Sequence, residues 1–489
     1  MLFNSFEFIL LFLPVTWVLY FQLNKKRLTV ASNAWLLFAS LVFYSWWNIS
    51  YLPLILVSIL FNYTVGCLLA EPRSAKKRPV SQKTILCFGL AGNLLFLGYF
   101  KYMDFFIVNL NTLFRGDLPL LQIALPLGIS FFTITQIAFL IDCYEGLVEE
   151  RQLLSYALFV TFFPHLLAGP ILHHKEMMPQ FDSVRSKVLN YRNVFRGLLL
   201  FFIGLFKKVI IADALAKTVK LGFDTSINLN MVEAWVVSLS YTLQLYYDFS
   251  GYSDMAVGVG LLFNIVLPVN FNSPYRATTI IDFWKRWHMS LTVFITTYLY
   301  APIIRCFRRI TFSKSMLATF LAMLIAGLWH GAGWTFILWG AFHGGALVLN
   351  HIWKKRKLHM PRALAWLLTF QFVNFSFVLF RARTLGDALR VLKGMVGVNG
   401  VLPGTIDRFS LSDLGRGLFW KQLMAGVKGN DMTLWTVVVV LIFTLTMKNS
   451  MELERAAKPS RGTLILLVAV SFYALININK VSEFLYFRF

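Results

Sequence analysis

Long apolar runs separated by short polar loops make up most of the chain. A helix needs about 20 apolar residues to cross the hydrocarbon core of a bilayer. Leu118–Ile141 holds 24 residues without a charge, and Leu153–Leu172 holds another 20. The other apolar stretches are Phe8–Phe21, Ser32–Trp47, Tyr51–Ala70, Thr84–Phe100, Gly197–Phe206, Ala234–Tyr247, Met255–Ser273, Leu291–Ile304, Ser315–Trp353, Ala363–Phe380, Leu434–Met447 and Gly462–Asn479. We therefore expect an all-α polytopic membrane protein with eleven or more helices, the shorter of which re-enter the membrane or lie buried.

The composition agrees with this pattern. Hydrophobic residues make up 57% of the 489 positions and charged residues only 14%, whereas a soluble domain carries about 25% charged residues. The mean hydropathy is +0.65. The apolar runs are continuous rather than alternating, which argues against a transmembrane β-barrel. Four cysteines in a chain of this length form no disulfide framework.

The formal net charge of +23 is concentrated in short loops between apolar runs. Such loops face the cytoplasm in membrane proteins and contact anionic lipids. The cluster 25–27 follows the first apolar run, and the basic loop 71–78 follows the third. Both agree with an N-terminus outside the cell. Membrane lipids, rather than nucleic acid, are therefore the expected partners of the basic residues.

We expect one membrane-embedded domain that covers residues 1–489. A polar interval late in the chain contains an amphipathic stretch, Leu385–Lys393, that favours a helix lying in the membrane interface. The expected parts are N-terminal helices (1–114), a core (118–380), the polar interval (381–433), and C-terminal helices with a tail (434–489).

The stretch Ser315–Trp353 is the most informative one for function. Its 39 residues contain no Asp, Glu, Lys or Arg, yet they include three histidines, His330, His343 and His351. At ~1.5 Å per residue the stretch is long enough for two crossings. His330 lies between glycines, and the neighbouring Trp329 suits the wall of a cavity. A neutral imidazole in a dry pocket suits a general base that acts on a hydroxyl. The alternative is a structural histidine that is hydrogen-bonded between helices.

A second candidate region follows residue 281. Trp284, Trp287 and His288 are spaced to share one helix face, with Lys285 and Arg286 projecting elsewhere. One interpretation is an interfacial helix with an aromatic belt and snorkelling cations. The other is a cytoplasmic entrance, in which His288 belongs to the site and the two cations lie near the phosphates of a donor.

Two carboxylates enter an apolar environment at Asp248 and Asp254. They are candidates for substrate binding, although a buried ion pair or a helix cap is the favoured interpretation. The run 173–176 contains two histidines and a glutamate, but no further ligands are identifiable, so we expect no metal site.

Several blocks together resemble the membrane-bound O-acyltransferase (MBOAT) family, and in particular its bacterial branch that acetylates alginate or peptidoglycan. They run in the family's order along nearly the whole chain. The blocks are Phe3-Asn4-Ser5, Leu125–Thr133, Gln136-Ile137-Ala138, Ala168–Ile171, Gly204–Lys208, Tyr247–Asp254, Phe283–His288, Leu328–Gly331 and Phe380-Arg381-Ala382.

This resemblance implies a ring of tilted helices around a funnel and a channel. It also implies that His330 is catalytic and that His288 is a second histidine in the channel. The implied reaction moves an acetyl group from a cytoplasmic thioester, acetyl-CoA, towards a polysaccharide outside a bacterial inner membrane. Acetyl-CoA is a donor substrate here, with no cofactor bound. Because the chain has no Gly-x-Ser-x-Gly elbow, the resemblance also implies a separate periplasmic or extracellular acyltransferase as a partner protein.

The aromatic C-terminus, Ser482–Phe489, resembles the tail of a small protein that accompanies D-alanyl-transferring relatives. That likeness implies that Tyr486 carries the acyl group outward. An interfacial tyrosine anchor is the alternative.

Two other classes of function remain open from the sequence. A transporter of a polysaccharide or lipid-linked sugar would explain the apolar runs and the intramembrane polar groups, although no internal repeat is visible. A non-catalytic scaffold of a secretion complex is the third possibility.

Overall fold

A computed structural model describes residues 1–71, 80–148, 152–401, 432–478 and 484–485. The described residues form helices and connecting segments without a β-strand, so the expected all-α class is confirmed. Five helical segments in this part of the chain are long and apolar enough to cross a membrane, and a bent pair of helices adds a sixth. The protein is therefore a polytopic membrane protein.

The helices form two compact units, each built from segments that are far apart in the sequence. The first unit contains residues 1–205, 252–270 and 454–489. Its elements are η1 (Glu7–Phe12), α1 (Leu13–Lys25), α2 (Thr29–Ser45), η2 (Ile49–Tyr51), α3 (Leu52–Ala70), α4 (Gln82–Leu97), η3 (Gly98–Tyr102), α5 (Met103–Phe114), α6 (Ile129–Tyr144), α7 (Leu153–Thr161), α8 (Phe163–Leu166), α9 (His174–Asp182), α10 (Val184–Lys187), α11 (Tyr191–Phe206) and α24 (Arg461–Ile476). Aromatic rings fill much of its core, among them the contacting rings of Phe3, Phe8 and Phe43.

The second unit contains residues 206–251 and 271–453. It begins in the middle of the chain and carries both sequence blocks with the candidate histidines. Its elements are η4 (Lys207–Ala212), α12 (Asp213–Phe223), the first part of α13 (Met231–Leu262), η5 (Pro274–Arg276), α14 (Ile280–Trp284), α15 (Met289–Phe294), η6 (Ile295–Tyr300), α16 (Ala301–Arg305), α17 (Phe312–His330), α18 (Trp334–Lys355), α19 (Arg362–Arg381), α20 (Leu385–Met395), α22 (Met432–Thr446) and most of α23 (Ser450–Ala456).

Several expected apolar spans are only partly helical. α8 ends at Leu166, before the end of the stretch Leu153–Leu172, and α13 ends at Leu262, inside the stretch Met255–Ser273. Leu118–Ile141 reads as a continuous apolar stretch, yet its helix, α6, begins at Ile129. Pro119 and Pro126 disfavour helix in the residues before them. Gly128 then adopts a left-handed backbone with φ of +72°. The expectation of a span that begins at Leu118 is therefore wrong, because hydropathy does not register these breaks.

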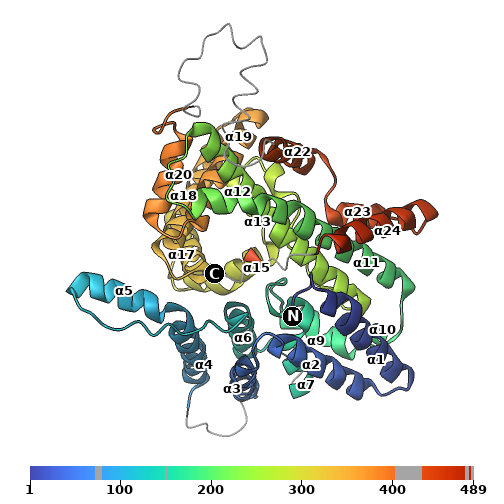
Figure 1. Cartoon of the computed structure of the whole chain (residues 1–489). Coiled ribbons are helices and arrows are strands. Elements are labelled where there is room, and N and C mark those ends of the chain that lie inside the picture. The colour runs from blue at the N-terminus through green and yellow to red at the C-terminus, as the bar shows by residue number, and fades with distance from the viewer. Residues whose placement is uncertain (72–79, 149–151, 402–431, 479–483, 486–489) are drawn as a thin grey trace. The chain divides into compact units, whose positions relative to one another are not determined.

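The uncharged stretch 315–353 forms the two expected helices. α17 and α18 pack along each other, and α18 also packs on α19, as Figure 1 shows. The backbones come close at Gly327 and Gly340. A Cβ atom on Gly340 would lie 2.6 Å from the carbonyl oxygen of Met323 and 3.0 Å from Cα of Gly327. Only glycine permits this approach, and it brings the end of α17 against α18.

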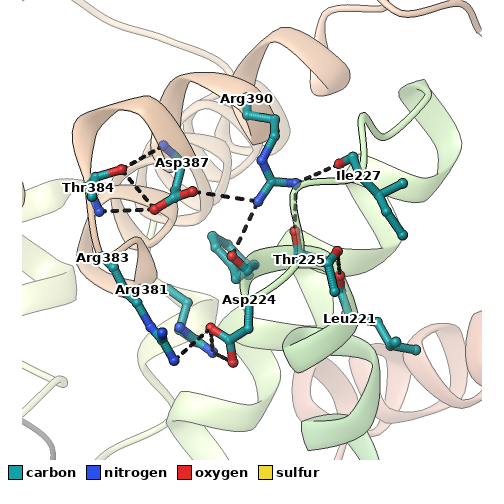
Figure 2. Close-up of polar contacts among 11 residues, drawn as sticks. Leu221, Asp224, Thr225, Ile227, Arg381, Arg383, Thr384, Asp387 and Arg390 are labelled. Carbon is teal, nitrogen blue, oxygen red and sulfur yellow. Dashed lines mark hydrogen bonds and ion pairs between the residues drawn. The ribbon is translucent and has the colours of Figure 1, made fainter.

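The amphipathic stretch forms α20 and is fastened to the end of α12 (Figure 2). Thr384 and Asp387 make a reciprocal capping box at its start. The Arg390 guanidinium donates hydrogen bonds to the carbonyl oxygens of Gly222, Phe223 and Ile227, which follow or end α12. These bonds satisfy carbonyl groups that the end of a helix leaves without partners. The helix predicted within the polar interval is thus confirmed, whereas residues 402–431 of that interval lie outside the described part.

Candidate functional site

His330 is the last residue of α17, and only 3% of its surface is exposed. Its ring lies 5.0 Å from that of Trp329, 5.1 Å from that of Trp339 and 5.2 Å from that of Phe380, measured between centroids. These rings come from α17, α18 and α19. Because Gly331 continues in an extended backbone, the helix ends directly at the imidazole. The result is a histidine enclosed by aromatic side chains.

A second histidine, His343, lies one turn further along α18 than Trp339 and is fully buried. Its Nδ1 accepts a hydrogen bond from Nε1 of Trp284 at 3.3 Å, and its Nε2 lies 2.9 Å from Oγ of Ser376. Since Nδ1 accepts, we assign the proton to Nε2, which donates to Ser376. The Ser376 hydroxyl in turn donates to the carbonyl oxygen of Val373. This chain fixes a neutral tautomer of His343 and joins α14 to α18 and α19.

The expected helix face of Trp284, Trp287 and His288 is not present. α14 ends at Trp284, and His288 has a left-handed backbone with φ of +43° before α15 begins. The three side chains therefore pack against different neighbours. Trp284 packs against Trp339 and His343 of α18, whereas Trp287 stacks on Phe283. The prediction of one shared face was wrong. The spacing of these residues assumed one continuous helix, and it does not reveal that the helix ends at Trp284 or that His288 has a left-handed backbone.

His288 is nonetheless buried in the same unit as His330. Its ring meets Phe249 of α13 edge-to-face at 4.7 Å, and Phe249 contacts Phe271, which contacts Trp287. From Trp287 the ring contacts continue through Phe377 and Phe380 to His330. Both histidines thus belong to one aromatic framework, although the framework does not bring their rings into contact.

The two candidate cations behave differently. Arg286 forms an ion pair with Asp282 at 2.9 Å, four residues earlier. Lys285 is exposed, forms no ion pair within the described part of the chain, and lines a cavity of about 440 Å³. The cavity also contains Trp284 in its wall. Its other lining residues include Ile295, Tyr300, Phe312, Ser315, Met316, Thr319, Met323, Leu347 and His351.

The end of this cavity that is lined by Phe312 and His351 lies beside two strongly basic segments. Residues 301–315 contain four Lys or Arg and residues 351–362 contain five, with no Asp or Glu in either segment. The two segments meet in space, since Nζ of Lys355 lies 4.1 Å from the centroid of the Phe312 ring. The cavity runs along α17 from Phe312 to Met323, which is about 16 Å at the rise of a helix. An elongated ligand with an anionic end matches this shape and charge.

The two candidate aspartates are not brought together in one unit. Asp248 is buried and forms an ion pair of 2.6 Å with Lys208, which also contacts Asp213 at 3.0 Å. The favoured interpretation of a structural ion pair therefore fits Asp248. Asp254 is buried on the later part of α13, which belongs to the first unit.

Tyr486 lies outside the described residues. Two residues earlier, Phe484 is buried and stacks on Tyr252 at 4.6 Å, and Tyr252 stacks on Phe3. These three rings belong to the first unit. The tail is therefore anchored in the core of that unit shortly before Tyr486.

His174 of the 173–176 run lies 2.8 Å from a carboxylate oxygen of Asp142. No cluster of three or more potential metal ligands occurs in the part of the chain that the structure describes. The pair is thus a local contact between α9 and α6.

Trp339 and Phe380 were not identified as site residues from the sequence, although Phe380 is part of a resembling block. An aromatic residue in an apolar helix is normally a packing residue. The only pointer to Trp339 was its position four residues before His343, which places both on one helix face.

The sequence profile of MBOAT, the membrane-bound O-acyltransferase family, matches residues 41–385. Two full-length relatives agree with this match. The peptidoglycan O-acetyltransferase of Helicobacter pylori is 43% identical, with 100% of this chain and 98% of the relative aligned. A probable alginate O-acetylase of Azotobacter vinelandii is 36% identical, with both chains aligned over 100% of their length.

A more distant similarity covers part of the chain. The teichoic acid D-alanyltransferase of Bacillus subtilis is 28% identical over 53% of this chain and 69% of its own. All these relatives are named as enzymes that transfer an acyl group.

Proposed function

We propose that this chain, which belongs to the membrane-bound O-acyltransferase family and is an O-acyltransferase, acetylates an extracytoplasmic polysaccharide. The observation that carries this proposal is the imidazole of His330, which aromatic side chains enclose. The full-length similarity to acetyltransferases of the same family supports it. The peptidoglycan relative shares 43% of aligned residues and the alginate relative 36%. Peptidoglycan is therefore the acceptor to test first.

The proposed donor is acetyl-CoA that approaches from the cytoplasm. The basic segments 301–315 and 351–362 suit its phosphates and, by the positive-inside rule, face the cytoplasm. Lys285 suits a phosphate or the polar start of the arm. Arg286 is less suited, because Asp282 already neutralises it. The 440 Å³ cavity suits the long arm that ends in the thioester.

The wall of this cavity leads towards His330. Trp284 lines the cavity and contacts Trp339, whose ring lies 5.1 Å from His330. About seven residues of α17, or ~10 Å, separate Met323 from His330. A thioester at the inner end of the cavity therefore has a short path to the imidazole.

In the proposed reaction, His330 accepts the proton of an acceptor hydroxyl as its oxygen attacks the thioester carbonyl. His288 positions or polarises a reacting group in the same framework. Trp329 and Trp287 help to enclose the reaction. The acetyl group then reaches the polysaccharide through a periplasmic or extracellular acyltransferase, in a bacterial inner membrane with the N-terminus outside.

The glycan itself provides the first test. Mass spectrometry of the cell-wall peptidoglycan should show a loss of O-acetyl esters when the chain is deleted. Re-expression of the wild-type chain or of Cys87→Ala, which alters an exposed cysteine of the first unit, should restore them. His330→Gln should not. Unchanged peptidoglycan acetylation in the deletion strain would remove peptidoglycan as the acceptor.

The carrier role of Tyr486 has its own test. A phenol can hold an acetyl ester, and Phe484, two residues earlier in the chain, stacks on Tyr252. We expect Tyr486→Phe to lose glycan acetylation while acetyl-CoA still binds. Phe484→Tyr, which keeps the aromatic anchor, should retain it. Undiminished acetylation by Tyr486→Phe would show that the acyl group passes directly to another hydroxyl.

A further inference from the structure

The indole of Trp339 is the most enclosed aromatic group next to the proposed base. Only 1% of its surface is exposed. Its ring contacts those of His330, His343, Phe380 and Trp284 at centroid distances of 5.1, 4.7, 5.2 and 5.9 Å. It therefore lies between the wall of the donor cavity and the imidazole.

Among the residues that the structure describes, none accepts a hydrogen bond from the indole N–H of Trp339. Other tryptophans of this protein find one, including Trp284, which donates to His343. Further examples are Trp17, Trp35, Trp235 and Trp366, each of which donates to a backbone carbonyl oxygen. A buried donor without an acceptor costs folding free energy, and such groups in native proteins call for an explanation. A ligand that supplies the acceptor would remove this cost.

We propose that the Trp339 N–H donates a hydrogen bond to the carbonyl oxygen of the acetyl thioester and stabilises the negative charge that develops there. This inference rests on the proposed acyl transfer. It makes Trp339 a catalytic residue beside His330.

The step balances as follows. The acceptor oxygen bonds to the thioester carbon, the carbonyl π electrons move to the oxygen that Trp339 holds, and the hydroxyl proton passes to His330. The carbonyl then re-forms, the carbon–sulfur bond breaks, and the thiolate takes the proton back from His330. The products are the acetyl ester and the free thiol.

The surroundings hold the indole in a fixed orientation. His343 packs on it at 4.7 Å and is itself held at both ring nitrogens by Trp284 and Ser376. A donor that is already oriented stabilises developing charge most effectively in a dry site, because it need not reorganise during the reaction. His343 is thus a positioning residue for Trp339.

The decisive variant replaces Trp339 with β-(3-benzothienyl)alanine by nonsense suppression. This side chain has nearly the shape of tryptophan but carries sulfur in place of N–H. With purified protein and acetyl-CoA, we expect kcat to fall roughly 100-fold, as for other single donors to an oxyanion, while KM for acetyl-CoA stays within about twofold of the wild-type value. The same replacement at Trp435, an exposed residue on α22, should leave kcat unchanged.

The outcomes separate this inference from the proposed function. A wild-type protein that transfers acetyl, together with a benzothienyl variant of unchanged kcat, would overturn the role of Trp339 alone. A folded wild-type protein that transfers no acetyl group would overturn the proposed function, and the inference with it. Trp339→Phe, which removes the N–H by a different route, should show the same loss of kcat.

Discussion

At the scale of single residues, Lys208 and Asp248 form a deeply buried ion pair in the second unit. Their side chains are 5% and 1% exposed. Each charge removed from water needs its partner, because an isolated buried charge is very costly. The family block that contains Lys208 and the one that contains Asp248 thus meet in a contact that secures η4 against α13.

We expect Lys208→Met to lower the free energy of unfolding by about 3–5 kcal/mol, because it leaves Asp248 charged and buried. Thermal unfolding of the detergent-solubilised protein measures this loss. The double variant Lys208→Met/Asp248→Asn should recover most of it. Arg383→Met, which removes a 71% exposed side chain that lies 3.6 Å from Asp224, should cost at most about 1 kcal/mol. Equal stability of Lys208→Met and wild type would show that the pair does not support the fold.

The sequence was sufficient to identify titratable residues in apolar stretches, such as His330. It was not sufficient to identify the aromatic residues that pack around them, such as Trp339. His330 stood out because it is a polar group in an uncharged stretch, and its burial agrees with that interpretation. Trp339 did not stand out, since its role depends on contacts with α14 and α19, which lie far from it in the sequence. His343 was noticed, but only the positions of Trp284 and Ser376 reveal that both its nitrogens are occupied.

At the scale of elements, the crossing of α17 and α18 decides where His330 lies. Hydrophobicity was sufficient to predict two helices in 315–353, and the amphipathic pattern was sufficient for α20. Hydrophobicity did not predict the breaks at Gly128 and His288, because left-handed residues depend on local backbone geometry rather than on apolar content.

We expect Gly340→Ala to separate α17 from α18, because the new methyl group would meet the carbonyl of Met323. The overpacking should lower the free energy of unfolding by about 1–3 kcal/mol. It should also reduce kcat, because His330 lies on α17 and Trp339 on α18, so that separating the helices moves these two side chains apart. Parallel measurements of melting temperature and acetyl transfer test both effects.

Gly345→Ala is the matched control on the same helix. Its new methyl group would meet nothing within 4 Å, and alanine should stabilise the helix by up to about 1 kcal/mol. If both alanine variants behave alike, the close approach at Gly340 has no influence on the site.

At the scale of the whole molecule, the chain divides its family blocks between two compact units. His330, His288 and Asp248 belong to the second unit, whereas Asp254, Tyr252 and the anchored Phe484 belong to the first. The second unit thus contains the residues of the proposed chemistry, whereas Phe484, which precedes Tyr486 by two residues, is anchored in the first unit. The basic residues of α17 and α18 lie at the start of α17 and at the end of α18, and His330 lies at the other end of α17.

Acetyl transfer by the purified chain tests the central claim most directly. The measurement follows radiolabelled acetyl-CoA as it loses its acetyl group to a hydroxyl acceptor, with wild-type protein and with His330→Gln that elutes and melts like the wild type. We predict thioester-dependent transfer by the wild type and a loss of at least about 100-fold in His330→Gln, the range of a general base. Full turnover by folded His330→Gln would contradict the account.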